Sequence, residues 1–283
     1  MILCRLAFLI TLHGTILKPP SGVVPVTTQI ATHPIDRDDA AELFDLLAIR
    51  LDGRIASVAK NVNNLSILGG NAVMMIQCGV AIGKPSSDLK KLFRIAVESY
   101  ARIFQSLGPN QKGKPISREE HLLLGDLPIQ VNSRVDESLQ GVGNCRLGFC
   151  LAIIQGLPKP IRVFASITSE QLKKSSTTAD KGLYLFFDAI ASVVSETDDQ
   201  LTRIDAAIPV ATRGPDRWLK TVGAQTLKLM RALVNPADDF EKCLISALDA
   251  HKRYWNSSAD NRRDPDGYFA YEISAICKLA IKQ

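Results

Sequence analysis

Two polar residues are candidates for acid–base chemistry because each lies within an apolar helical pattern. His251 falls on the apolar face of a predicted helix that begins near Asn235, and Glu272 lies among the apolar residues of the last predicted helix. A buried histidine or carboxylate can act as a catalytic base because burial changes its pKa. More often such a group holds two helices together through hydrogen bonds. The pattern favours the structural role, and a helical hydrolase that uses His251 and Glu272 is an alternative.

Three short motifs resemble known sites, but each departs from the pattern that its chemistry needs. Residues 79–86 (GVAIGKPS) have three residues between the glycines and Pro after the lysine, whereas a phosphate-binding loop needs four residues and then Ser or Thr. Residues 57–60 (SVAK) match an acylating S-x-x-K motif without its partner motifs. Residues 264–267 (DPDG) resemble a calcium loop, but Arg262 and Ile273 stand where carboxylates are required. None of the three predicts a catalytic or metal site.

The cysteines and histidines do not form a metal-binding pattern either. Cys145 and Cys150 are five residues apart in a predicted helix and therefore point about 140° apart, too far to share a metal ion. The four histidines lie in four separate segments. Neither a metal nor another cofactor is expected. Six cysteines in 283 residues are too few for a disulfide-stapled secreted domain, so we expect buried thiols in a cytoplasmic protein.

Charge and composition limit the class of partner. The 34 Lys and Arg residues are interleaved with 29 Asp and Glu residues, which gives a net charge of +5 and a mixed surface rather than a basic stripe. Nucleic-acid binding needs such a stripe, often with aromatic side chains for base stacking, and aromatic residues make up only 6% of this chain. We therefore expect a partner other than nucleic acid.

The chain divides into a short N-terminal extension and one long helical region. Residues 2–17 are apolar but are interrupted by Arg5 and His13, and they are too short for a stable membrane span. We expect residues 1–32 to be an apolar extension with a proline-containing linker outside the fold, and residues 33–283 to form one helical domain. An export or anchoring signal in residues 2–17 is the alternative to a purely cytoplasmic protein.

Apolar residues recur at helical spacing through almost all of residues 36–281, which predicts an all-α domain of stacked antiparallel helices. Asp36 is expected to cap the first helix, and Asn235 with Pro236 is expected to begin a later one. A polar loop is predicted over 256–267, and a small β-hairpin is predicted near 113–131. The predicted helices cover about 36–58, 66–82, 89–107, 135–155, 160–165, a short turn after 168, 183–194, 216–233, 236–255 and 268–281.

The C-terminal third resembles a known family. The helix over 240–255 ends in H-x-x-Y-W, the turn over 264–267 follows a polar loop, and an apolar helix contains residues 275–280 (AICKLA). With residues 163–175 and the helix over 184–190, this arrangement resembles the immunity protein 49 family of bacterial polymorphic toxin systems over about residues 33–282. Residues 267–272 are also similar to the immunity group of PoNe-type DNase toxins. The residues that mark the family resemblance are His251, Tyr254, Trp255, Asp264 and Gly267.

The resemblance implies a non-enzymatic protein that binds a cognate protein toxin and neutralises it by occlusion. Recognition residues concentrate in loops, so the predicted loop over 256–267 and the irregular stretch over 111–132 are the candidate surfaces. The alternative to both the immunity protein and the enzyme is a helical scaffold unrelated to toxins. The candidate partner-binding residues are Asp260, Arg262, Arg263 and Asp264.

Overall fold

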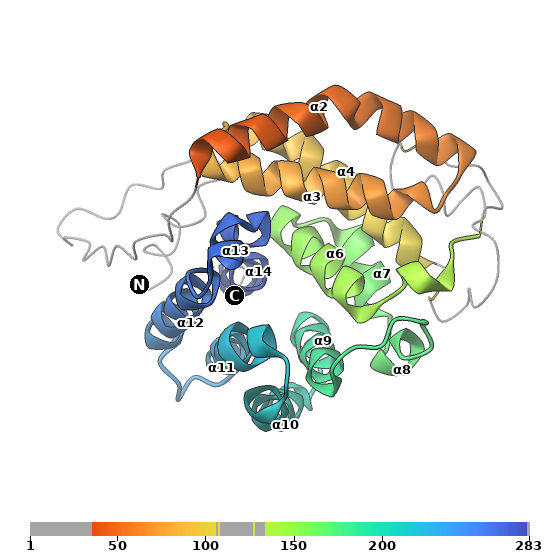
Figure 1. Cartoon of the computed structure of the whole chain (residues 1–283). Coiled ribbons are helices and arrows are strands. Elements are labelled where there is room, and N and C mark those ends of the chain that lie inside the picture. The colour runs from red at the N-terminus through yellow and green to blue at the C-terminus, as the bar shows by residue number, and fades with distance from the viewer. Residues whose placement is uncertain (1–35, 106, 108–126, 128–133, 282–283) are drawn as a thin grey trace, which may run out of the picture.

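The computed structural model describes residues 36–105, 107, 127 and 134–281 (Figure 1). Within these residues all regular structure is helical, which confirms the predicted all-α class. The extension over 1–32 and the irregular stretch over 111–132 lie outside the described residues, as does the predicted hairpin near 113–131, except for Leu127.

Three long antiparallel helices form one side of the molecule: α2 (Arg37–Lys60), α3 (Asn64–Ala81) and α4 (Ser86–Gln105). As predicted, Asp36 caps α2, and its carboxylate accepts hydrogen bonds from two backbone N–H groups of the first turn. By length and apolar composition α3 could cross a membrane. Most of it is buried here, because it packs between α2 and α4 as a core helix.

The middle of the chain packs against the inner face of α4. The helix α6 (Val142–Gln155) contacts α4, and α7 (Pro158–Ala165) contacts both. A complete capping box at Thr168 begins the short α8 (Ser169–Leu172), and Asp180 caps α9 (Lys181–Val194). The remaining element of this part is the 3₁₀ turn η1 (Glu137–Leu139).

The C-terminal helices continue from α9 in an arc, visible in the lower half of Figure 1. The last helix packs against α6, α11 and α12, so it lies on the inner side of this arc. The elements are α10 (Gln200–Arg213), the π turn η2 (Leu219–Gly223), α11 (Ala224–Val234), α12 (Phe240–Trp255), α13 (Ala259–Arg263), the 3₁₀ turn η3 (Pro265–Tyr268) and α14 (Tyr271–Ala280).

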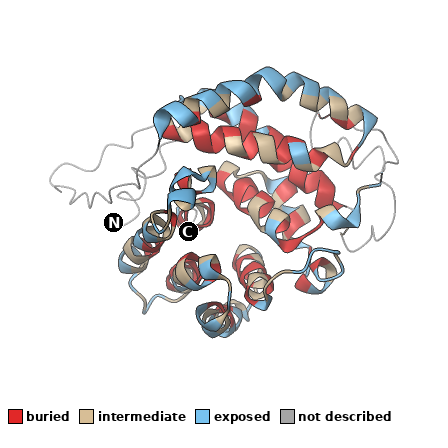
Figure 2. Cartoon of the chain, in the orientation of Figure 1, coloured by how far each residue is buried: buried red, intermediate tan, exposed pale blue. Residues whose placement is uncertain are grey.

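One continuous hydrophobic cluster joins the two sides of the molecule, running from Leu47 on α2 to Cys277 on α14 (Figure 2). The helices approach closely at Gly148 on α6, where a Cβ atom would lie 2.6 Å from the Cβ of Tyr100 and from the ring of Phe164. The described cysteines are all free thiols, and burial raises the pKa of Cys277 to about 12.

Four local expectations were wrong. The helix predicted over 135–155 begins only at Val142, because the 3₁₀ turn η1 and Gly141 precede it. The pattern missed α10, which contains Pro209 in its interior and has only three buried residues, so its apolar stripe is thin. The helix expected from Asn235 begins at Phe240 instead, because Asp239 provides the cap and Asn235 forms a turn of its own by accepting from the Ala237 N–H. The predicted loop over 256–267 contains the short helix α13 and the 3₁₀ turn η3.

Candidate functional site

His251 holds α12 against the turn before the last helix. Its Nε2 atom lies 3.1 Å from the backbone oxygen of Gly267 in η3, at hydrogen-bonding distance, so the ring donates to this carbonyl. Burial lowers the pKa of His251, although this hydrogen bond and the Glu272 carboxylate act in the opposite direction. At pH 7 the side chain is therefore a neutral imidazole, and its Nε2 is engaged in a hydrogen bond to a backbone carbonyl.

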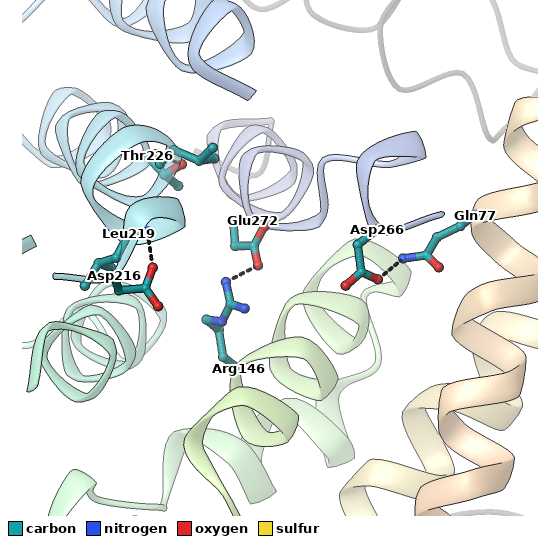
Figure 3. A network of polar contacts seen from close by, with 8 residues as sticks. Gln77, Arg146, Asp216, Leu219, Thr226, Asp266 and Glu272 are labelled. Carbon is teal, nitrogen blue, oxygen red and sulfur yellow. Dashed lines mark hydrogen bonds and ion pairs between the residues drawn. The ribbon is translucent and has the colours of Figure 1, made fainter. Parts of the chain in front are cut away.

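Glu272 has a different partner. Its Oε1 atom accepts from Nη1 of Arg146 on α6 at 2.5 Å, and only 10% of the Glu272 side chain and 18% of the Arg146 side chain are exposed (Figure 3). The Arg146 guanidinium also lies 4.2 Å from the centre of the Trp218 ring, as expected for a cation–π contact. Arg146 therefore ties the last helix to the segment that precedes η2.

These contacts show what the two candidate bases do in the fold. His251 and Glu272 are on neighbouring elements, but each is hydrogen-bonded to a different group, and the structure gives no hydrogen bond between them. Glu272 joins two helices that are 126 residues apart, whereas His251 joins α12 to the 3₁₀ turn that follows 16 residues later. The arrangement thus supports the structural role that the sequence favours.

The residues that mark the family resemblance cluster where α12 meets η3. The Tyr254 and Trp255 rings make an edge-to-face contact at 5.0 Å, and the His251 ring is 6.1 Å from that of Trp255. The Asp264 carboxylate accepts from the backbone N–H of Asp266 and caps η3. Together with the His251 bond to Gly267, these contacts form a structural joint.

A further contact links this joint to the long N-terminal helices. The Asp266 carboxylate accepts from Nε2 of Gln77, a buried residue of α3, at 2.8 Å (Figure 3). Asp266 therefore faces α3, and α14 begins at Tyr271 without a side-chain cap.

The candidate partner-binding residues all lie on the surface, in and directly after α13. Asp260, Arg262, Arg263 and Asp264 are exposed. Two of them also make local contacts, because Arg262 donates to the backbone oxygen of Asn256 at 3.2 Å and Asp264 caps η3. The structure thus brings the four together on one small surface, and Arg262 reaches back to the end of α12.

Next to this surface lies a groove that the sequence did not reveal, here called the α11–α12 groove. It consists of two adjoining depressions of about 620 and 330 Å³, which share Gln225 and Arg253. Its walls are α12 on one side and η2 with the start of α11 on the other, and these elements pack against each other. The lining residues are Arg217, Lys220, Thr221, Gln225, Ser246, Asp249, Lys252, Arg253, Tyr254, Asn256 and Ser257.

The groove carries an excess of positive charge. Arg217, Lys220, Lys252 and Arg253 line it, against the single carboxylate of Asp249. None of these four cations forms an ion pair with a described carboxylate. By contrast, Arg231 on α11 pairs with carboxylates before and after its own helix.

The local fold around Trp218 explains how the groove wall is built. The helix that leads into α11 begins after Asp216, whose carboxylate accepts from the Leu219 N–H at 2.7 Å, and then widens into the π turn η2. Directly before this turn, the half-buried Trp218 contacts Arg146, while Arg217 and Lys220 on either side of it are exposed. Basic residues on either side of an aromatic residue were the only signal in the sequence, and this pattern is too common in proteins to identify a groove.

In the described part of the chain, no group of three or more histidine, cysteine or acidic side chains is arranged to hold a metal ion.

Comparison with known proteins gives one match. The family model described as immunity protein 49 matches residues 86–283, which include the α11–α12 groove, the joint of α12 with η3, and the Arg146–Glu272 pair. No curated protein and no solved structure matches the chain.

Proposed function

Because this chain belongs to the immunity protein 49 family and so has an immunity role, we propose that it neutralises a cognate bacterial toxin by binding and occluding it, without catalysis. Occlusion needs a rigid body with a complementary surface, and no reactive group. The observation that carries the proposal is that the interior polar side chains are engaged in contacts that hold the fold together. His251 and Glu272 hold elements of the fold together, whereas the cations of the α11–α12 groove lie at the surface without an ion pair to a described carboxylate.

The proposed site of action is the cytoplasm. In support of this, four of the described cysteines are buried in the apolar core as free thiols, as is usual for a protein of a reducing compartment.

A protection assay tests the immunity function. The toxin domain encoded beside this gene is expressed in a susceptible host, alone or with residues 1–283, and growth is followed. We expect the full chain to restore growth and to co-purify with the toxin domain. A folded, well-expressed chain that neither restores growth nor co-purifies would refute the proposal. A second arm with residues 33–283 tests the location, because rescue by the full chain alone would place the action at the membrane.

A titration separates occlusion from catalysis. Purified toxin is mixed with increasing amounts of the full chain, and the remaining toxin activity is measured. Occlusion predicts a linear loss of activity that ends near one equivalent, with active toxin recovered when the complex is dissociated. Complete inactivation by a small fraction of an equivalent would show that the chain acts as an enzyme on the toxin.

A further inference from the structure

We infer that the α11–α12 groove is the docking surface for an acidic segment of the partner protein, with Lys220 and Arg253 as its main contacts. This inference rests on the proposed immunity function. It places the interface in the groove, beside the α13 residues that the sequence suggested. It also specifies that the part of the toxin that binds there is acidic.

The geometry places cations on both walls of one continuous groove. Lys220 belongs to the η2 wall and Arg253 to the α12 wall, and both side chains are exposed. Arg253 lines both depressions, so a segment bound along the groove contacts Arg253 from either end. Arg217 and Lys252 extend the same charge toward the two ends.

The chemistry of the lining favours carboxylates of a protein. Small-molecule pockets are mostly apolar and enclosed, whereas here every lining residue is polar or charged and the groove is open to solvent. A nucleic-acid site needs a longer run of phosphate contacts than the four cations of this groove offer. Arginine and lysine at such a density instead suit the carboxylates of an acidic surface, where they add specificity and speed up association.

The groove is also held rigid, which lowers the entropic cost of binding. The wall that carries Lys220 is fixed from inside, because Trp218 packs against Arg146 and the ring of Phe186. A π turn inside an α-helix is uncommon and frequently occurs at a functional site. Here the π turn carries Lys220, which lines the groove, and it directly follows Trp218.

The test compares two charge reversals of equal size in the full chain. Lys220→Glu with Arg253→Glu changes the groove, whereas Lys90→Glu with Lys91→Glu changes two exposed lysines on α4, a helix without substantial contacts to α11 or α12. Binding to the toxin domain encoded beside the gene is measured at several salt concentrations. We expect the groove variant to lose affinity on the order of 100-fold, mostly through slower association at low salt, and the α4 variant to stay within about threefold.

A milder variant guards against misfolding. Lys220→Gln with Arg253→Gln removes the charges without adding repulsion, and we expect a loss of about tenfold with an unchanged circular dichroism spectrum. If the wild type protects and both groove variants bind the toxin as tightly as it does, the docking inference is wrong and the immunity function stands. If the wild type itself neither binds nor protects, the proposed function fails, and the docking inference with it. Binding to a short DNA duplex is measured in parallel. If the groove variants lose affinity for DNA but keep their affinity for the toxin domain, the inference is also overturned.

Discussion

The ion pair between Arg146 and Glu272 should contribute measurably to stability, and Glu272→Gln tests this with little change in volume. Breaking a buried pair by removing one partner costs about 3–5 kcal/mol. The lower end applies here, because 18% of the Arg146 side chain is exposed. The glutamine oxygen still accepts a hydrogen bond from the charged guanidinium, worth about 1.5 kcal/mol, so we expect a net loss of roughly 1.5–2 kcal/mol in the free energy of unfolding.

The assay is thermal and urea denaturation followed by circular dichroism. For a chain of this size, about 2 kcal/mol corresponds to a fall in Tm of about 4–8 °C. The control is the double variant Arg146→Met with Glu272→Leu, in which no charge stays buried without a partner. It should be more stable than Arg146→Met alone, since apolar replacement of a buried pair is often neutral.

Two results would refute this reasoning. A change below about 0.5 kcal/mol in the Glu272→Gln variant would show that the pair behaves like an exposed one. Loss of toxin protection by that variant at unchanged stability would be the more serious result. It would mean that the Glu272 carboxylate acts directly on the toxin, and the enzyme hypothesis would regain support.

Three further predictions concern the joint, the core and the surface. Because burial lowers the pKa of His251, the unfolded chain binds a proton more readily, and stability falls as pH drops below about 6.5, by at most about 1.4 kcal/mol per pH unit. His251→Gln should flatten the dependence of Tm on pH between 7.5 and 5.5, and an unchanged slope would contradict a buried neutral imidazole. Gly148→Ala should cost about 1–2 kcal/mol in denaturant unfolding, whereas Gly143→Ala on the same helix has open space and should cost nothing, and equal effects would contradict the close approach. Arg262→Glu with Arg263→Glu should weaken toxin binding less than the groove variant does, and unchanged affinity would remove α13 from the interface.

The helices were predictable wherever their signals are local. The cap at Asp36 acts within one turn of its own residue, so the sequence places the start of α2 within a few residues. The same logic failed at Asn235, where two capping residues compete and Asp239 prevails. It also failed at α10, because a helix with few buried residues has a weak apolar period.

The candidate site was predictable only in part. His251 and Glu272 attract notice because each is polar among apolar neighbours, but their partners are out of reach of sequence reasoning. Glu272 pairs with a residue 126 positions away, and Asp266 pairs with one 189 positions away. The predicted partner-binding residues are exposed as expected, yet the larger charged surface lies beside them.

The sequence by itself determined the helical class, most of the helix boundaries and the family, because all three depend on residue types at short and regular spacing. Only the tertiary structure decided which polar groups meet. The α11–α12 groove combines cations from residues 217–220 and 252–253, and these become neighbours only when α11 and α12 pack side by side. That packing depends on how apolar faces fit one another across the whole core, so no single stretch of the chain specifies it.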